Sequence, residues 1–200
     1  RGGVSPVNRR AVFLDRDGTI NEDVGYPSRW IQIEVYPWSP GAVRRLNAAG
    51  FVVAVVTNQS GVGRGFYSED ELAGLHAGLV ADFARRGARI DRIYHCPHHP
   101  RAVDPRYRRD CSCRKPGPGM GRRAAEDFAL DLSRSFMIGD KADDVMFARA
   151  IGATPVLVLT GYGKEARKTL AASGIEPAAV VADLGEAVDW VLRRAIEDPS

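Results

Sequence analysis

Short apolar runs alternate with longer amphipathic segments along most of the chain. Continuous apolar runs of strand length indicate strands that are buried on both faces, as in a parallel sheet covered by helices. The pattern therefore predicts an α/β fold with a doubly wound, Rossmann-like parallel sheet. The predicted strands are Ala11 to Leu14, Phe51 to Val56, Ile90 to Tyr94, Ser135 to Ile138, and Thr154 to Leu159.

The segments between these runs predict helices. Pro40 to Ala49 has a helical pattern that stops at Gly50. Ser68 followed by Glu71 forms a capping-box signature, in which each side chain satisfies a free backbone amide, so a helix is expected from there to about Gly87. The other expected helices are Gly119 to Ala129, Ala142 to Ile151, Lys164 to Ser173, and Leu184 to Ala195.

Length and composition bound the class of protein. With 200 residues, 44% of them hydrophobic, the chain can bury one full core. We expect a flexible N-terminal segment over 1–10 and a single domain over 11–195. The net charge of +3 is too small to indicate a nucleic-acid partner without a basic face. No signal-peptide core or membrane-spanning run is evident, so we expect a cytoplasmic protein that does not bind membrane. We also expect a monomer that does not bind nucleic acid.

Polar residues follow three of the predicted strands. Asp15 and Asp17 come directly after the first strand, and Thr57 and Asp140 follow two others. Side chains two residues apart on an extended chain lie on the same side. Because ligands in open α/β sheets bind beyond the carboxyl ends of the strands, we expect these residues to meet at one site.

A pair of aspartates one residue apart is common by chance, and a turn or a calcium loop would also explain it. An EF-hand loop needs glycine at its sixth position and an acid at its twelfth. Counted from Asp15, those positions hold Ile20 and Tyr26, so the EF-hand explanation fails.

Four short motifs place carboxylates, a hydroxyl and a lysine in a fixed order along the chain. They are Asp15-x-Asp17-Gly18-Thr19, Val55-Val56-Thr57-Asn58, Arg114-Lys115-Pro116, and Ile138-Gly139-Asp140-x-x-x-Asp144. Together they resemble the haloacid-dehalogenase-like (HAD) phosphatases. The resemblance implies a HAD-type sheet that carries out Mg²⁺-dependent phosphoryl transfer.

By this resemblance, Asp15 is the nucleophile that forms an aspartyl phosphate, and Asp17 protonates the leaving oxygen and then deprotonates water. Mg²⁺ is held by Asp15, the backbone carbonyl of Asp17, and Asp140. Thr57 hydrogen-bonds the transferring group and Lys115 neutralises its charge. These roles depend on the motifs occurring together.

Taken singly, three of these residues have simpler explanations. Thr57 could merely end a strand, and Lys115 could be a surface residue before a proline. Asp144 could orient Lys115 or a metal-bound water, or it could be a first-turn acid that the helix dipole favours.

The cysteines form a second motif, Cys96-x-His98 followed by Cys111-x-Cys113. Three thiolates and one imidazole make a tetrahedral zinc set without an open position, which is typical of a structural site in a loop spanning 96–113. Three cysteines argue against a disulfide framework, although they could gather by coincidence. His95 or His99 could replace His98 as the fourth ligand.

The zinc loop narrows the resemblance to the branch that contains histidinol-phosphate phosphatases and heptose 1,7-bisphosphate 7-phosphatases. Thr57 to Gly61 and Cys113 to Met120 look like the heptose enzymes. This implies removal of the 7-phosphate of D-glycero-D-manno-heptose 1,7-bisphosphate, in the synthesis of nucleotide-activated heptose or the lipopolysaccharide core. The connections that follow the first two strands leave no room for a separate cap domain.

The same resemblance assigns contacts to a small anionic sugar bisphosphate. Tyr26 could instead be a packing residue, Gly25 a turn, and Arg64 could either hold the distal phosphate or be exposed. The assigned contacts are Asp23, Val24, Gly25, Tyr26, Asn58, Gln59, Ser60, Arg114 and Lys141.

Two other functions stay open. One is a histidinol-phosphate phosphatase or a broad phosphatase that also accepts nucleic-acid 3′ ends. The other is an inactive phosphate-binding or zinc-stabilised interaction domain, which the intact Asp15, Asp17, Lys115 and Asp140 argue against.

Overall fold

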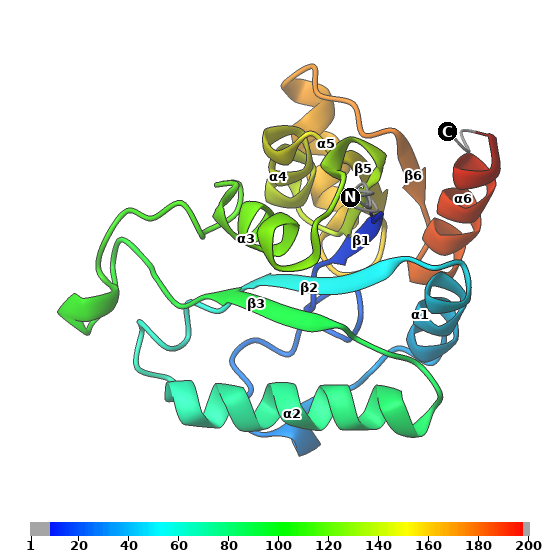
Figure 1. The fold of residues 1–200 in the computed structure, drawn as a ribbon. Coiled ribbons are helices and arrows are strands. Elements are labelled where there is room, and N and C mark those ends of the chain that lie inside the picture. The colour runs from blue at the N-terminus through cyan, green and yellow to red at the C-terminus, as the bar shows by residue number, and fades with distance from the viewer. Residues whose placement is uncertain (1–8, 198–200) are drawn as a thin grey trace, which may run out of the picture.

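The computed structural model describes residues 9–197, which form a six-stranded parallel sheet with helices on both faces (Figure 1). The strand order is β3-β2-β1-β4-β5-β6, and every neighbouring pair is parallel. The strands are β1 (Ala11–Leu14), β2 (Val52–Asn58), β3 (Arg92–Cys96), β4 (Phe136–Gly139), β5 (Thr154–Val158) and β6 (Ala179–Val181). The doubly wound fold predicted from the sequence is confirmed.

Alternating strand residues face two different cores. Val12 and Leu14 pack in the core on one face, and Ala11 and Phe13 pack in the core on the other. On the first face lie α1 (Ser39–Ala48), α2 (Glu69–Arg85) and α6 (Leu184–Glu197), and on the second α3 (Gly119–Phe128), α4 (Ala142–Ile151) and α5 (Gly163–Ala172). Short 3₁₀ helices are η1 (Trp30–Gln32), η2 (Pro105–Tyr107) and η3 (Leu132–Arg134).

Most of the predicted elements lie within a residue or two of their expected bounds. The capping box forms as expected, because Glu71 N donates to Ser68 Oγ at 3.1 Å and Ser68 N donates to Glu71 Oε2 at 2.7 Å. The strand β6 was not predicted, since its three residues are too few to make a periodic signal. None of the described helices combines the length and apolar character of a membrane span.

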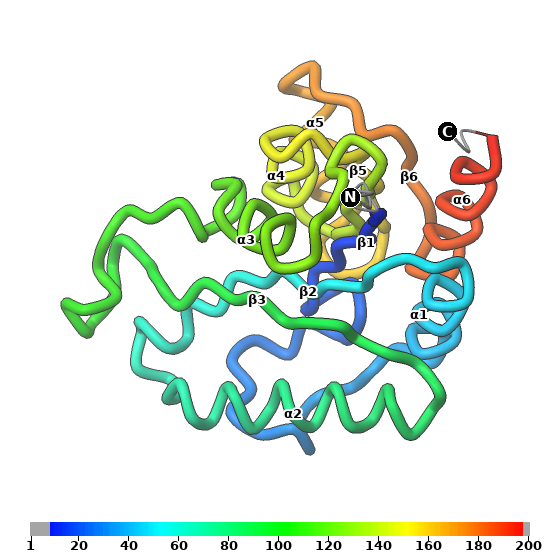
Figure 2. Tube along the Cα trace, viewed as in Figure 1, coloured from blue at the N-terminus to red at the C-terminus, as the bar shows by residue number. Residues whose placement is uncertain are grey.

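The start of the described chain and residues 97–118 both lie outside the α-helices and strands. Of the expected flexible segment 1–10, residues 1–8 lie outside the described range, whereas Arg9 N donates to Ala129 O at 3.2 Å. The chain between β3 and α3, residues 97–118, makes a long excursion beyond the sheet before it returns (Figure 2). We call it the excursion.

Candidate active site

A buried lysine lies between two carboxylates at the carboxyl edge of the sheet. Asp15 directly follows β1, and Asp144 lies in the first turn of α4. Lys115 Nζ is 2.9 Å from Asp15 Oδ1 and 2.6 Å from Asp144 Oδ1. All three side chains are almost inaccessible to solvent, so water screens these ion pairs little.

The charges at this edge shift the pKa values of their neighbours. Burial by itself would raise the pKa of Asp15, but Lys115 and Lys141 outweigh it and hold that pKa below its usual value. Burial likewise opposes the charge on Lys115, but Asp144 and Asp15 raise its pKa. Asp15 is therefore an anion and Lys115 a cation at neutral pH.

Asp140 follows β4, and its pKa is shifted in the opposite direction to that of Asp15. Its Oδ2 accepts a hydrogen bond from Tyr162 N at 2.8 Å, but its buried Oδ1 has no partner among residues 9–197. Burial, reinforced by the charge of Asp15, raises the pKa of Asp140 to about 8. A buried, ionised carboxylate with an unpartnered oxygen destabilises the fold unless a cation compensates its charge.

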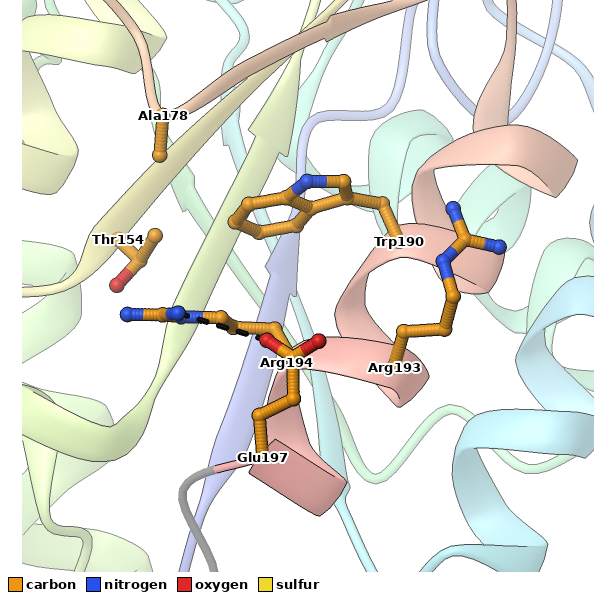
Figure 3. A pocket seen from close by; sticks show the side chains of 6 residues that line it. All are labelled: Thr154, Ala178, Trp190, Arg193, Arg194 and Glu197. Atoms are coloured by element: carbon orange, nitrogen blue, oxygen red, sulfur yellow. Dashed lines mark ion pairs between the residues drawn. The ribbon is translucent and has the colours of Figure 1, made fainter.

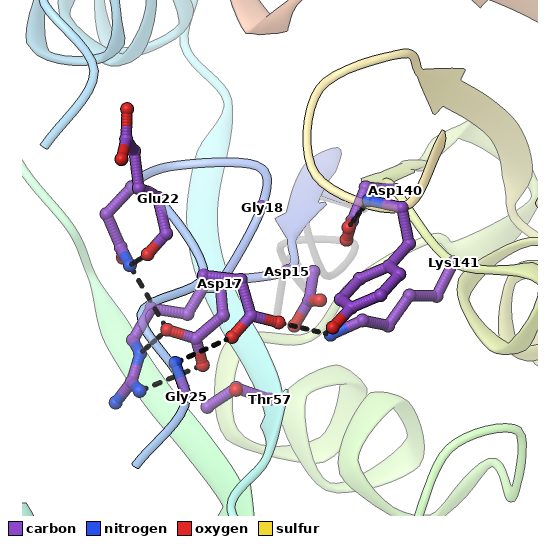
Figure 4. Close-up of polar contacts among 12 residues, drawn as sticks. Asp15, Asp17, Gly18, Glu22, Gly25, Thr57, Asp140 and Lys141 are labelled. Atoms are coloured by element: carbon purple, nitrogen blue, oxygen red, sulfur yellow. Dashed lines mark hydrogen bonds and ion pairs between the residues drawn. The ribbon is translucent and has the colours of Figure 1, made fainter. Parts of the chain in front are cut away.

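The Asp140 carboxylate packs so closely against two glycines that a larger residue would not fit at either position. A Cβ atom added at Gly18, where φ is +84°, would lie 2.2 Å from Asp140 Oδ2, and one added at Gly161 would lie equally close. Carboxylate oxygens of Asp15, Asp140 and Asp144 lie within 4.8 Å of one another and could hold a metal ion. Figure 4 shows Asp15, Asp17, Asp140 and Lys141 gathered at the strand ends.

The carboxylate of Asp17 is held by a buried network. It accepts hydrogen bonds from Arg16 Nε at 3.0 Å, Arg16 Nη2 at 2.8 Å, and Asn21 Nδ2 at 3.1 Å. Gln59 Nε2 adds a fourth at 2.9 Å. Arg16 Nη1 also lies 3.2 Å from His76 Nε2. Burial, with a smaller contribution from the charge of Arg16, lowers the pKa of His76 to about 3. The His76 ring is therefore neutral and can accept a hydrogen bond from Arg16.

Gln59 also connects Asp17 to the threonine at the end of β2. Its Nε2 donates to the buried Thr57 Oγ1 at 2.8 Å, and Tyr67 OH donates to its Oε1 at 2.7 Å. Gln59 is expected from the sequence, whereas Tyr67, Arg16 and His76 are not. Only the arginine gave a signal, since it lies between the two aspartates of the first motif.

A cavity of about 400 Å³ opens above these groups. All of the expected substrate contacts except Val24 line it, and Val24 is exposed. The lining residues are Asp17, Asp23, Gly25, Tyr26, Asn58, Gln59, Ser60, Tyr67, Arg114, Lys141, Asp143 and Tyr162.

Lys141 and Tyr26 shape the rim of this cavity. Lys141 Nζ is 3.3 Å from Asp23 Oδ2 and 5.2 Å from the centre of the Tyr162 ring. Although burial opposes its charge, Asp15 and Asp140 raise the pKa of Lys141, which keeps it cationic. Tyr26 stacks on Phe66 with 4.3 Å between ring centroids, and Arg64 donates to its hydroxyl.

A second cavity, of about 390 Å³, lies near the amino ends of β5 and β6 (Figure 3). Trp190 and Arg194 line it, and Arg194 Nη1 pairs with Glu197 Oε2 at 3.5 Å. Its lining includes none of the candidate site residues. The first cavity is therefore the candidate active site.

The end of β3 and the excursion together carry a separate cluster of potential metal ligands. Cys96 Sγ is 3.2 Å from Cys113 Sγ and 3.6 Å from Cys111 Sγ, and His98 Nδ1 is 3.3 Å from Cys113 Sγ. These four side chains could hold a metal ion. The two alternative histidines are engaged elsewhere: His95 Nε2 lies 3.0 Å from Glu69 Oε2, and His99 Nδ1 accepts from Arg101 N at 3.1 Å.

Comparisons with known proteins agree with this geometry. A family model described as HAD-hydrolase-like matches residues 112–187. The chain is 42% identical over 187 residues to the D-glycero-D-manno-heptose-1,7-bisphosphate 7-phosphatase of Thermosynechococcus vestitus, which covers 92% of this chain and 95% of that protein. It is 45% identical over 148 residues to the D-glycero-beta-D-manno-heptose-1,7-bisphosphate 7-phosphatase of Rhodopseudomonas palustris, covering 74% and 82% of the two chains.

A solved structure supports the same relationship. The D,D-heptose 1,7-bisphosphate phosphatase from B. bronchiseptica, complexed with magnesium and phosphate, is 34% identical and superposes with a TM-score of 0.79 over 93% of this chain and 99% of that chain. Fold, site and sequence therefore agree. The chain belongs to the family of D-glycero-D-manno-heptose 1,7-bisphosphate 7-phosphatases, within the HAD-like hydrolases.

Proposed function

We propose that the protein hydrolyses the 7-phosphate of D-glycero-D-manno-heptose 1,7-bisphosphate, with Asp15 as nucleophile. The observation that carries this proposal is a buried, ionised Asp15 beside Lys115, close to a cavity lined by Arg114 and Lys141. Cations around an anionic nucleophile offset its repulsion from a phosphate ester.

The proposed reaction has two steps. Asp15 attacks phosphorus and forms an aspartyl phosphate, while the bond from phosphorus to the sugar oxygen breaks. For this step Asp17, on the cavity wall, would have to carry a proton in place of one of the hydrogen bonds that its carboxylate now accepts, and it would give that proton to the sugar oxygen. It then takes a proton from the water that attacks phosphorus, which releases inorganic phosphate and restores Asp15.

Lys115 and Thr57 stabilise the transferring group in this proposal. The ammonium of Lys115 neutralises charge on the phosphoryl oxygens from its position beside Asp15. Because Gln59 Nε2 donates to Thr57 Oγ1, the Thr57 hydroxyl hydrogen stays available for a phosphoryl oxygen.

Asp15, Asp140 and the backbone carbonyl of Asp17 are the proposed Mg²⁺ ligands. The unpartnered Asp140 Oδ1, buried among other carboxylates, supports the assignment, since hard oxygen ligands suit Mg²⁺. When bound, Mg²⁺ supplies positive charge that lets the phosphate and the nucleophile approach each other.

Zn²⁺ is the proposed ion for the cluster in the excursion. A tetrahedral zinc with bonds of about 2.3 Å to sulfur separates its thiolates by about 3.8 Å, a few tenths more than the cysteine distances here. The set of Cys96, His98, Cys111 and Cys113 leaves no open position, which supports a structural role. The ion would fix Arg114 and Lys115, which directly follow Cys113.

Substrate choice is the sharpest test of the proposal. Phosphate release with Mg²⁺ is measured from both anomers of the heptose bisphosphate, from histidinol phosphate, and from a 3′-phosphorylated oligonucleotide. We expect the highest kcat/KM with a heptose bisphosphate, because Lys141 and Arg114 suit two phosphates. Equal efficiency on all substrates would contradict the proposal, and Asp15→Asn is the inactive control.

The cellular setting is inferred from this substrate. We propose that the enzyme acts as a cytoplasmic monomer in the synthesis of nucleotide-activated heptose or the lipopolysaccharide core. Light scattering of the purified protein tests the monomer, and a dimer at micromolar concentration would contradict it.

A further inference from the structure

We propose that Asn58 is a positioning residue: it places Lys115 by holding the backbone of that residue and does not contact the substrate. This inference rests on the proposed function, in which Lys115 stabilises the transferring phosphoryl group. Asn58 also lines the candidate cavity, and sequence resemblance assigns it to the substrate, so the two roles compete.

The contact between the two residues is reciprocal. Asn58 Nδ2 donates to Lys115 O at 3.1 Å, and Lys115 N donates to Asn58 Oδ1 at 3.0 Å. Both polar atoms of the amide are thus directed at the main chain of one residue 57 positions away. A paired contact of this kind restrains the orientation of the lysine backbone as well as its distance.

Asn58 is itself firmly placed. It is the last residue of β2, a strand that pairs with β1 on one side and with β3 on the other. In that register it lies beside Cys96, and the next residue extends the pairing because Gln59 N donates to Cys96 O at 2.8 Å. The amide of Asn58 therefore projects from the sheet and not from a loop.

Lys115, in contrast, lies in the returning part of the excursion. The turns around it are tight, with Gly117 N donating to Arg114 O at 2.7 Å and Gly119 N to Ser112 O at 2.7 Å. Its side chain reaches back to Asp15 and ends there. A shift of the lysine backbone would move Nζ away from its carboxylates, and misplacing a reacting group by about 1 Å can cost about 100-fold in rate.

Asn58 also connects the cysteine cluster to the site. Cys96 lies at the end of β3, next to Asn58 in the sheet, and Cys113 lies two residues before Lys115. The cluster draws the two chain segments together on one side. The Asn58 side chain holds the segment that contains Cys113 against the sheet at a second point, by hydrogen bonds to the backbone of Lys115.

The chain offers a matched control at Asn47. Asn47 Nδ2 donates to Arg89 O at 3.0 Å, and Arg89 N donates to Asn47 Oδ1 at 2.7 Å. This is the same kind of reciprocal contact, made by a half-buried residue near the end of α1. Asn47→Ala therefore removes a pair of hydrogen bonds equivalent to the pair that Asn58→Ala removes, at a position away from the candidate active site.

The first test compares the steady-state kinetics of both variants on heptose bisphosphate. Asn58→Ala is expected to lower kcat about 10- to 100-fold with KM within about threefold, and Asn47→Ala to change both less than about twofold. A raised KM with unchanged kcat in Asn58→Ala would show a direct substrate contact and overturn the proposal. Should Asn58→Ala not fold, Asn58→Gln keeps the amide but moves it by one methylene, and the same loss of kcat is expected.

A double-mutant cycle with Lys115→Ala separates the two roles further. If Asn58 acts through the lysine, adding Asn58→Ala to Lys115→Ala changes substrate affinity, measured by calorimetry, by less than about twofold. An additional loss of tenfold or more would overturn the proposal.

A crystal structure of Asn58→Ala provides a readout that does not depend on the substrate. Displacement of Lys115 Nζ from Asp15 is expected, and an unmoved lysine would refute the positioning role. If the wild-type protein fails to hydrolyse heptose bisphosphate, the proposed function fails, while this crystallographic result still decides the role of Asn58.

Discussion

The sheet edge and the excursion place reactive groups by different physical means. At the edge, β1 and β4 pair side by side and deliver Asp15 and Asp140 from a buried core. In the excursion, Val103 is largely exposed, and His98, Cys111 and Cys113 instead gather around Cys96 at the end of β3. The lysine of the site comes from the excursion but functions at the edge. We therefore expect activity to depend on both regions, and the fold of the sheet to depend on only one.

The largest expected effect is at the sheet edge. Asp15→Asn removes the nucleophile while keeping the size of the side chain, so kcat is expected to fall at least about 1000-fold in a phosphate-release assay. Asp189→Asn breaks a surface ion pair with Arg45 and should leave kcat within about twofold. Substantial activity in Asp15→Asn would contradict the assigned chemistry.

Loss of the proposed Zn²⁺ should reduce activity and leave the sheet folded. Cys111→Ser is expected to lower the zinc content, measured by atomic absorption, and to reduce kcat/KM about 10- to 100-fold. Circular dichroism should show retained helices and strands, since the two cores do not include this cysteine. Zinc loss at full catalytic efficiency would refute the dependence of Lys115 on the excursion.

Metal-free stability should depend on pH through the sheet edge. The pKa of Asp140 is raised to about 8 in the folded state from 3.8, so between these values only the folded chain holds the proton. Stability of the metal-free fold therefore falls as pH rises through this window, and the smaller rise for Asp144, to about 6, acts in the same direction.

Mg²⁺ should reverse this loss, because it binds the ionised carboxylate. The rise in Tm on adding Mg²⁺ is expected to be larger at about pH 8.5 than at about pH 5, and smaller in Asp140→Asn than in the wild type. Calorimetry measures the rise in Tm for both proteins at both pH values. An Mg²⁺ effect independent of pH and of Asp140 would count against this cation site.

The smallest expected effect is at the rim. Phe66→Ala removes the ring stacked on Tyr26, a contact worth about 0.5–1.5 kcal/mol, so KM should rise about tenfold or less with kcat unchanged. Val103→Ala, in the excursion, is the exposed apolar control and should change neither constant. A fall in kcat for Phe66→Ala would place the aromatic pair in the chemistry itself.

The sequence predicts the parts of the molecule that depend on local pattern. Buried apolar runs indicate the strands, and Ser68 with Glu71 marks the start of α2. The sequence leaves open which histidine completes the cysteine cluster, because His95, His98 and His99 all lie near Cys96. The end of β3 and the direction of each ring decide it.

The pattern of residues along the chain does not predict side-chain contacts between distant segments. Arg16 lies within a recognisable motif, but nothing in the sequence shows that it is fully buried against Asp17 and His76. The contact of Asn58 with Lys115 joins two motifs, and its partner is a backbone. Backbone partners leave no residue-type signature.

The central claim is that Asp15 attacks phosphorus, and detection of the phosphorylated enzyme tests it most directly. The protein is mixed with heptose bisphosphate and Mg²⁺, quenched with acid during turnover, digested, and analysed by mass spectrometry. We predict a phosphoryl group on Asp15 that is absent from Asp15→Asn. A phosphoryl group on a different residue, or none during turnover under conditions that preserve acyl phosphates, would contradict the account.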